Sequence, residues 1–220
     1  SIVSTDMAYG IAKKQGIKLH DVLTGFKFIG EVIKNYEAQG KADGFVLGFE
    51  ESYGYLLGSY ARDKDAVEAS MMILEMTAFY KKQNMTLCDA LETLYETYGN
   101  YAEGMIDIYM EGFDGIERRK RVMSSLRADA PRAFGEYKVA TVGDYLDGTV
   151  KSILDGSVTS TGQPASDVLY YTLENEDKII VRPSGTEPKI KVYILTKGQD
   201  AAERDANLKK YGEWVDTLKK

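Results

Sequence analysis

The sequence predicts an α/β module followed by an α+β module. Up to about residue 97, short apolar stretches alternate with segments of helical periodicity, which is the signature of strands and helices packed in layers. From about residue 136, several short strands precede a closing helix, a pattern typical of an antiparallel sheet covered on one face. The composition, 44% hydrophobic with 16 Tyr and 7 Phe among 220 residues, can fill the cores of two small domains.

The first half is expected to contain strands at Ile2–Thr5, Lys18–Leu23 and Gly44–Phe49. The expected helices are Met7–Gln15, ended by Gly16, then Phe26–Tyr36, Asp65–Lys82 and Thr86–Thr97. The helix over residues 65–82 is apolar almost all round, which predicts that it is buried against other elements.

The second half is expected to begin with a strand at Tyr101–Met110 and a helix at Gly115–Leu126. The later strands are expected at Glu136–Val142, Val168–Leu173, Lys178–Arg182 and Lys189–Leu195, and the closing helix at Ala201–Leu218. Asn175–Asp177 is predicted to form the tight turn between two of these strands.

The charge distribution argues against a nucleic-acid-binding protein. The net charge is −6, whereas binding to a phosphate backbone requires a basic excess. Residues 1–112 carry 10 Lys and Arg against 17 Asp and Glu, and residues 113–220 carry 18 against 17, so the second half is the better place for an anionic ligand. The densest basic run, Arg118–Arg121, is expected to form a solvated helix face.

Other classes of protein are excluded by scarce residue types. One Cys leaves no disulfide framework and no cysteine-built metal site, and one His, His20, leaves no His-rich metal centre. The longest apolar runs are too short to cross a bilayer, so no membrane partner is expected. The chain begins at Ser1 without a signal-peptide pattern, which we interpret as the start of a processed or excised piece.

The segment Gly48–Gly54 is the first that carries chemistry. It lies at the carboxyl end of an apolar strand, where open α/β sheets place their ligands. If the extended path persists, Glu50 and Ser52 lie on one side and Glu51 on the other. A carboxylate acceptor beside a hydroxyl suits the vicinal hydroxyls of a sugar. The alternative is a polar turn that simply ends the strand.

The segment Arg182–Pro188 is the second segment that carries chemistry. Its Pro and Gly residues favour a compact turn in which the Ser184 and Thr186 hydroxyls and backbone N–H groups converge, and such turns bind anions. Arg182 adds a bidentate fork suited to phosphate, and Lys191 lies on the following strand. The alternative is a hairpin turn held by an Arg–Glu pair. No Gly-Lys-Ser/Thr follows, so the segment is not a Walker loop.

A third segment, Thr24–Gly30, lies at a strand-to-helix turn. Gly25 there would let the backbone approach a ligand, and Lys27 falls in the first helical turn. The alternative for Lys27 is an ordinary solvated side chain.

Four segments together resemble the α-D-phosphohexomutases, the family of phosphoglucomutases and phosphomannomutases. They are Thr24–Glu31, Gly48–Gly54 followed by Arg62–Asp65, Tyr98–Tyr101 and Arg182–Pro188. In that family four domains surround one cleft. By this resemblance, residues 1–112 match most of the third, sugar-binding domain, an α/β domain with a mixed sheet. Residues 113–220 match the fourth, phosphate-binding domain, whose antiparallel sheet is similar to the TATA-binding-protein fold.

The resemblance also implies roles for individual residues. It assigns sugar contacts to Glu50 and Ser52, and it places Gly25 and Lys27 near the sugar. It assigns the phosphate to five residues of the second half: Arg182, Ser184, Gly185, Thr186 and Lys191. The family has Lys or Arg at the position of Lys191, and Lys offers only a single-point contact.

Two motifs of the family do not occur in this sequence. These are the loop with the phosphorylated serine and the Asp-rich loop that binds Mg²⁺, so no catalytic or metal-binding residue is expected here. The resemblance implies a cytoplasmic parent enzyme that interconverts hexose 1-phosphate and 6-phosphate through a phosphoserine and glucose 1,6-bisphosphate. The expected partners of this chain are a phosphosugar and the missing N-terminal domains, and the chain alone is expected to be inactive.

Two other functions stay open at this stage. The chain could act as a non-catalytic phosphosugar-binding module, or as an interaction domain whose polar loops only shape a surface. Within the enzyme hypothesis, the residues do not distinguish glucose from mannose or pentose phosphates.

Overall fold

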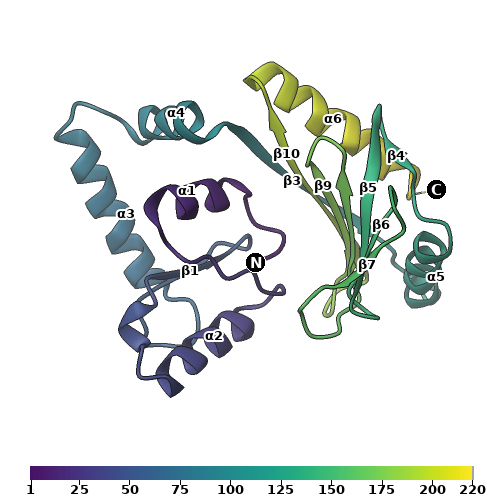
Figure 1. Ribbon diagram of the computed structural model, residues 1–220, viewed down its shortest axis with the longest axis horizontal. Helices are drawn as coiled ribbons and strands as arrows, with labels where there is room; N and C mark the ends of the chain where they lie inside the picture. The colour runs from purple at the N-terminus through teal and green to yellow at the C-terminus, as the bar shows by residue number, and fades with distance from the viewer. Residues whose placement is uncertain (220) are drawn as a thin grey trace. The chain divides into compact units, whose positions relative to one another are not determined.

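The computed structural model describes residues 1–219, which form two compact units (Figure 1). The first unit is Ser1–Gly99, and the second begins at Asn100. The division between the units therefore falls after Gly99, whereas the sequence analysis expected it near residue 112. The reason is that β3, Asn100–Tyr109, pairs along its whole length with β10, Lys189–Gly198, and so belongs to the second unit.

The first unit contains four α-helices, a 3₁₀ turn and one hairpin within residues 1–99. Its elements are α1 (Met7–Gln15), α2 (Phe26–Ala38), η1 (Ala42–Gly44), β1 (Leu47–Glu50), β2 (Gly54–Leu57), α3 (Ala66–Lys81) and α4 (Leu87–Tyr98). All four predicted helices are confirmed, because their ends carry strong local signals. Gly16 ends α1 in the left-handed conformation, the Asp65 carboxylate caps α3, and Thr86 with Asp89 forms a capping box on α4.

Two of the predicted strands of the first unit are wrong. Residues 2–3 form a turn, and residues 17–23 are not assigned to a strand. One backbone hydrogen bond, from Ile2 N–H to the Val22 carbonyl at 2.8 Å, joins the two segments. Alternating apolar residues become a strand only where a neighbouring strand completes the ladder. In this unit only β1 and β2 pair, antiparallel to each other, so the mixed sheet expected for it is not formed by residues 1–99.

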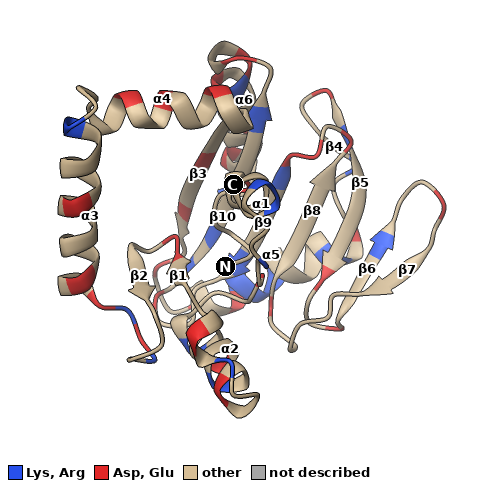
Figure 2. Cartoon of the chain, turned by 60° about the vertical axis from the view of Figure 1, so that its left-hand side comes forward, with Lys and Arg blue, Asp and Glu red and all other residues tan. Residues whose placement is uncertain are grey.

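The expected burial of α3 is also wrong. The helix has no buried residue; Val67 is 73% and Leu74 is 69% exposed, and the methionines at 71, 72 and 76 are exposed as well. Figure 2 shows the helix mostly without charge. The core of the unit lies instead between α2 and β2, where Phe26, Ile29, Ile33 and Leu56 pack together. None of the helices of residues 1–219 is long and apolar enough to cross a membrane.

The second unit is an antiparallel eight-stranded sheet with two helices. Its strand order is β3-β10-β9-β8-β5-β6-β7, with β4 paired to β5. The elements after β3 are α5 (Gly115–Ala128), β4 (Ala133–Phe134), β5 (Tyr137–Asp144), β6 (Thr149–Ser152), β7 (Val158–Ser160), β8 (Leu169–Leu173), β9 (Lys178–Pro183), β10 and α6 (Ala201–Thr217). The predicted strands and both predicted helices are confirmed, whereas β4, β6 and β7 were not predicted because they are short and, in β7, fully exposed.

One face of this sheet packs against α5 and α6. Ile190, Val192 and Ile194 alternate along β10 and contact a core that includes Met123 of α5 and Tyr211 of α6. Because side chains alternate along a strand, Lys191 and Tyr193 project from the opposite face. The helices therefore leave the charged residues of β9 and β10 on the face that they do not cover.

A buried carboxylate fixes the turn between β8 and β9. Asp177 is 2% exposed and accepts four hydrogen bonds. The donors are Thr196 Oγ1 at 2.7 Å, Tyr211 OH at 2.7 Å, Asn175 Nδ2 at 2.8 Å and the Lys197 backbone N–H at 2.9 Å. This network joins the turn to β10 and α6, and burial together with the bond to Asp177 raises the pKa of Tyr211.

Replacing Asp177 by alanine is expected to destabilise the second unit strongly. Asp177→Ala leaves buried donors without an acceptor and should lower the free energy of unfolding by about 3 kcal/mol or more. Urea unfolding followed by the fluorescence of Trp214, the only tryptophan, measures this unit. Asp205→Ala, which removes an exposed partner of Arg204 on α6, should cost less than about 1 kcal/mol. Equal losses in the two variants would contradict the assignment.

Candidate functional site

The hairpin β1–β2 positions the first group of polar side chains. Glu50 is the last residue of β1 and pairs with Gly54, the first of β2. Although it is charged, Glu50 is only 7% exposed, and its Oε1 accepts a hydrogen bond of 2.9 Å from Ser52 Oγ. The two residues assigned to the sugar are therefore in direct contact.

The path between them differs from the expected one. Residues 51–53 form a turn, so the strand does not continue to Ser52. The turn bends the chain back and returns the Ser52 hydroxyl to Glu50, while the Glu51 carboxylate accepts a bond of 2.8 Å from Ser1 Oγ. Tyr53 closes the turn with φ +62°, a conformation that is strained for a bulky residue. Glu50 and Glu51 have different partners because of this turn, and not because of the strand alternation that the sequence analysis expected to place them on opposite sides.

Lys64 lies beside Glu50. A Cβ placed on Gly54 would be 2.9 Å from Glu50 Cγ and 3.0 Å from Lys64 Cδ, so both side chains cover this glycine. The Lys64 ammonium donates to Asp63 at 2.9 Å, and this bond, together with the charge of Glu50, raises the pKa of Lys64. The sequence did not single out Lys64, because it stands in what reads as the charged flank of a helix.

The start of α2 lies close to the same hairpin. Lys64 Nζ is 5.9 Å from the ring of Phe26, the first residue of the helix. Gly25 precedes it with φ +118°, a conformation that favours glycine. Lys27 is exposed in the first turn, with its ammonium 4.9 Å from the ring of Phe28. Lys64 thus connects Phe26 to the Glu50 hairpin, whereas the exposed Lys27 ammonium lies at the Phe28 ring.

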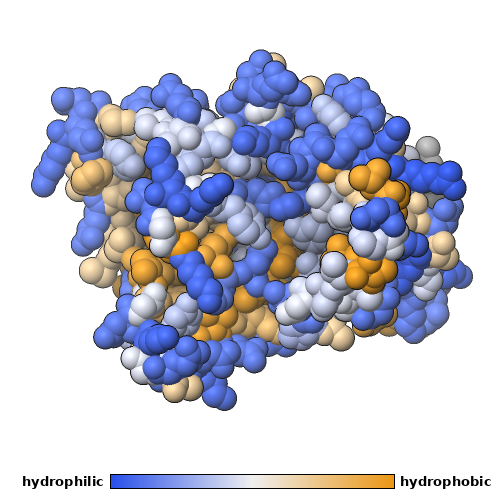
Figure 3. Space-filling model, viewed as in Figure 1, coloured by the Kyte–Doolittle hydropathy of each residue, from blue (hydrophilic) through white to orange (hydrophobic). Residues whose placement is uncertain are grey.

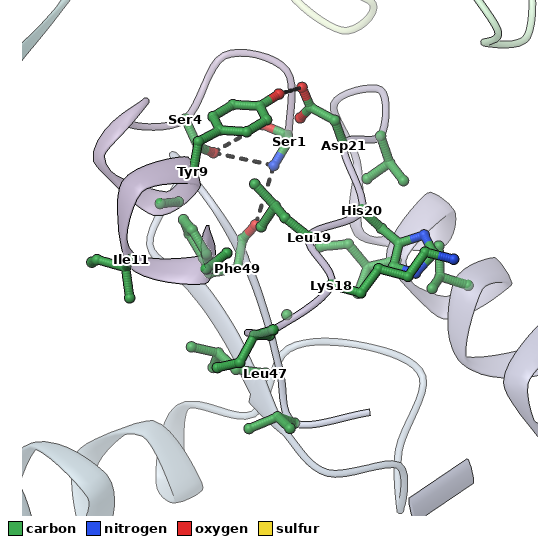
Figure 4. A pocket seen from close by; sticks show the side chains of 18 of the residues that line it. Ser1, Ser4, Tyr9, Ile11, Lys18, Leu19, His20, Asp21, Leu47 and Phe49 are labelled. Carbon is green, nitrogen blue, oxygen red and sulfur yellow. Dashed lines mark hydrogen bonds between the residues drawn. The ribbon is translucent and has the colours of Figure 1, made fainter. Parts of the chain in front are cut away.

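The first unit also contains a cavity of about 350 Å³ that is distinct from the Glu50–Ser52 pair. Figure 4 shows Ile11, Leu19 and Leu47 among its lining residues. Hydrophobic side chains also reach the surface over β1 and α2 in Figure 3. The lining is mostly apolar, although Ser4, Lys18, His20 and Asp21 also border it, and we do not assign the sugar to this cavity.

In the second unit, three charged residues form a row across neighbouring strands. Arg182 of β9 pairs with Lys191 of β10, which in turn pairs with Asp107 of β3. The Arg182 guanidinium donates to the Tyr193 hydroxyl at 3.2 Å, which holds it over the sheet. Two of the predicted phosphate-binding residues, Arg182 and Lys191, are therefore side by side.

The loop after β9 is ordered by its serine. Ser184 is 7% exposed, and its Oγ accepts from the backbone N–H groups of Thr186 at 3.4 Å and Glu187 at 3.2 Å. Those two N–H groups therefore point at the serine and do not join the expected anion-binding set. The hydroxyl hydrogen of Ser184, the Thr186 side chain and the backbone of Gly185 are what this loop offers to a phosphate.

Buried charge compensation underlies the loop. Lys189 is 5% exposed and bonds Asp107 and Glu187, each at 2.8 Å. These two bonds raise the pKa of Lys189. Although burial opposes it, the bond from Lys189 and the charge of Lys191, 3.4 Å away, lower the pKa of Asp107. Glu187 is thus paired with Lys189, which differs from the Arg–Glu hairpin pair considered as the alternative.

Arg119 contacts the same loop and was missed by the sequence analysis, which interpreted Arg118–Arg121 as a solvated face. Its Nη1 donates to the carbonyl oxygens of Ser184 at 2.9 Å and Glu187 at 2.8 Å. Helical periodicity could have indicated this contact. Arg119 stands four residues after Gly115 and four before Met123, so it lies on the same face of the helix as these two buried residues. The basic residues of α5 are blue in Figure 2.

The Mg²⁺ that the family resemblance implies finds no ligand set in residues 1–219. No group of three or more His, Cys, Asp or Glu side chains in this part of the chain could hold a metal ion. The carboxylates of the sites above are paired with Lys or Ser donors. We therefore derive no chemical step through a metal from these residues.

Comparison with known proteins identifies the family. Residues 1–98 match the family model described as phosphoglucomutase/phosphomannomutase, alpha/beta/alpha domain III. Residues 162–207 match the family model of the phosphoglucomutase/phosphomannomutase C-terminal domain. The chain belongs to the phosphoglucomutase/phosphomannomutase family. The chain corresponds to domain III and the C-terminal domain of the proteins of this family, as the sequence motifs predicted.

Curated relatives agree with this membership. The chain is 34% identical over 197 residues to a phosphoglucomutase of Staphylococcus aureus strain USA300, and 35% identical over 200 residues to that of strain N315. These alignments cover 90% and 91% of the chain but 35% and 36% of the relatives, so the chain spans about a third of their length.

The fold is similar to that of the exocytosis-sensitive phosphoprotein pp63/parafusin (phosphoglucomutase) from Paramecium, in an open form. The TM-score is 0.65 at 22% identity, over 99% of this chain and 37% of that one. The predicted fold class, an α/β domain followed by an antiparallel-sheet domain, is confirmed.

Gly54→Ala is expected to displace the Glu50 carboxylate. The new Cβ would lie 2.9 Å from Glu50 Cγ, so Glu50 must move and its bond with Ser52 is lost. The side-chain carboxyl ¹³C resonance of Glu50 reports this change. Gly44→Ala, whose nearest neighbour is the Tyr36 ring at 4.0 Å, is the matched control and should leave the resonance unchanged. A Glu50 resonance that is insensitive to Gly54→Ala would contradict the described packing.

Proposed function

We propose that this chain provides the sugar-hydroxyl and phosphate contacts of a phosphohexomutase of the phosphoglucomutase type. In the whole protein, the reaction would reversibly convert a hexose 1-phosphate into the 6-phosphate through a phosphoserine and glucose 1,6-bisphosphate. The observation that carries the proposal is the pairing of Arg182 with Lys191 beside the Ser184 loop. The relatives named phosphoglucomutase support the type of reaction.

Phosphate recognition belongs to the second unit in this proposal. The Arg182 guanidinium, held by Tyr193, offers a planar fork for two phosphate oxygens, and Lys191 adds a second positive charge. Ser184 Oγ already accepts two N–H groups, so its hydroxyl hydrogen can be donated to the ligand. Gly185 carries no side chain, which lets the phosphate approach the backbone.

Recognition of the sugar belongs to the first unit. The Glu50 carboxylate accepts hydrogen bonds from hydroxyl groups, and Ser52 can turn its hydroxyl toward the same ligand. Low exposure removes competing water from the carboxylate, so each bond to a sugar hydroxyl gains strength. Lys27 and Gly25 at the start of α2 are proposed as further sugar contacts, with Lys27 reaching the ligand through its long, solvated side chain.

This division suits a substrate that must present either phosphate to the reacting group. The phosphate loop would hold whichever phosphate is not reacting, and the hydroxyl contacts would be made in both orientations. None of these residues forms or breaks a bond with the substrate: they bind and orient it. Binding energy from such remote contacts lowers the barrier only by holding the reacting groups in place.

The proposal is tested by ligand binding to the 220-residue chain. Calorimetric titration should show that glucose 6-phosphate and glucose 1-phosphate bind more tightly than glucose or inorganic phosphate. An equal response to inorganic phosphate and the sugar phosphates would reduce the role of the chain to an anion site. No response to any of the four would favour an interaction domain. Mannose 6-phosphate and ribose 5-phosphate, added to the series, test the specificity.

Arg182→Ala is expected to weaken glucose 6-phosphate binding by about 30-fold to several-hundred-fold, because a bidentate charge-assisted contact contributes about 2–4 kcal/mol. Arg182→Lys keeps the charge but loses the fork, and it should fall between alanine and wild type. Calorimetry gives the Kd of each variant. Wild-type affinity in Arg182→Ala would return this segment to a purely structural hairpin.

Glu50→Gln is expected to weaken glucose 6-phosphate binding by at least about 30-fold, because one acceptor oxygen becomes a donor that faces a sugar hydroxyl. Glu51→Gln, the matched control, should change the Kd by less than about threefold, since that carboxylate is directed to Ser1. Both variants are compared after equal thermal stability has been confirmed. A larger loss at Glu51 would show that the sugar lies on the other side of the turn.

A further inference from the structure

Arg119 connects helix α5 to the loop that we assign to phosphate. One guanidinium nitrogen, Nη1, donates to the carbonyl oxygens of Ser184 and Glu187, at 2.9 and 2.8 Å. These carbonyls stand at the two ends of the four-residue loop, so a single charged group holds both ends at a fixed separation. Hydrogen bonds from a charged donor are stronger than those between neutral groups.

The helix that carries Arg119 is itself anchored. Gly115, at the first position of α5, is so close to the end of β3 that a Cβ there would lie 1.8 Å from the Met110 carbonyl oxygen. Met110 in turn donates its backbone N–H to the Pro188 carbonyl at 2.7 Å, next to the loop. Met123, one turn beyond Arg119, is in the core. Arg119 therefore extends from a fixed support to the loop.

The bonds of Arg119 act on the groups that would meet the ligand. The carbonyl groups of Ser184 and Glu187 point toward Arg119 on α5. Their oxygen atoms, which carry partial negative charge, therefore do not face an incoming anion. Ser184 Oγ is then held where it accepts the N–H groups of Thr186 and Glu187, and its hydrogen is left for the ligand. Without Arg119, the Ser184 carbonyl oxygen would need a new donor, and the loop could rotate it toward the phosphate. The Glu187 carbonyl would lose the guanidinium but keep the Lys189 backbone N–H at 2.8 Å.

We infer that Arg119 is a positioning residue that preorganises the 184–187 loop for a phosphate monoester. This inference rests on the proposed phosphate site but assigns to Arg119 a role in shaping it, separate from the contacts of Arg182 and Lys191. Preorganisation raises affinity because the ligand does not have to order the loop when it binds.

The test compares three variants by NMR titration with inorganic phosphate and with glucose 6-phosphate. Arg119→Ala should weaken binding of both ligands by about 10-fold to 100-fold, because two charge-assisted bonds that order the loop are lost. The Gly185 and Thr186 amide signals should also show faster hydrogen exchange before any ligand is added. Arg119→Lys keeps the charge but cannot reproduce the planar guanidinium, so it should recover only part of the affinity.

Arg121→Ala is the matched control, because it removes the same charge from an exposed position of the same helix. It should change the affinity by less than about threefold, as expected for a solvated charge. Trp214 fluorescence confirms that each variant is folded. If Arg119→Ala does not fold, Arg119→Lys and Arg119→Gln carry the comparison, and loop exchange with weaker binding is still expected.

Four results would overturn the inference or its basis. Wild-type affinity and loop exchange in Arg119→Ala would show that the loop orders itself. Full recovery by Arg119→Lys, or equal losses in Arg119→Ala and Arg121→Ala, would show that only the positive field matters. If phosphate shifts no signal of residues 182–191 in the wild-type chain, the proposed phosphate site itself is wrong, and the inference falls with it.

Discussion

The pairing of β10 with β9 on one side and β3 on the other is the constraint on which the second unit depends. It puts Arg182, Lys191 and Asp107 at matching positions of three strands. A slip of one residue in β10 would turn Lys191 toward the helices and send Ile190 and Val192 to the opposite face. The apolar face that packs on α5 and α6 therefore fixes the register, and the register fixes which cations reach the outer face.

Charge compensation decides which of these cations are available to a ligand. Lys189 is buried and serves Asp107 and Glu187, and Arg119 serves two backbone carbonyls. Removing a partner of the buried Lys189 leaves an unsatisfied charged group, which costs more than the contact contributes when complete. Arg182 is held instead by a neutral hydroxyl, Tyr193, so its charge is not cancelled where it is positioned. Lys189 and Arg119 thus fix the loop, whereas our proposal gives the phosphate to Arg182 and to Lys191, whose ammonium also lies 3.4 Å from Asp107.

Sequence reasoning succeeded where the signal is local and failed where a partner decides. Gly16, Asp65 and Thr86 mark helix ends by their own chemistry, and the turn near Asn175 follows the same logic. The stretches at Ile2–Thr5 and Lys18–Leu23 have the composition of strands, but they lack the paired neighbours that a ladder needs. The apolar character of α3 likewise predicted burial, although nothing in a helix's own sequence supplies the surface that would cover it.

The candidate site shows the same limit at the level of single side chains. The segments around Glu50 and Arg182 could be selected as candidate binding sites from residue types alone, because carboxylate, hydroxyl and guanidinium groups bind hydroxyl groups or phosphate. Arg119 lies 65 positions before Ser184, and only its place on the buried stripe of α5 distinguishes it from Arg118 or Arg121. A residue that binds backbone carbonyls leaves no sequence motif, because every residue of the chain has a backbone carbonyl. The geometry of a loop is therefore set by contacts that its own sequence does not contain, and a basic run should be judged by helical face before it is assigned to solvent.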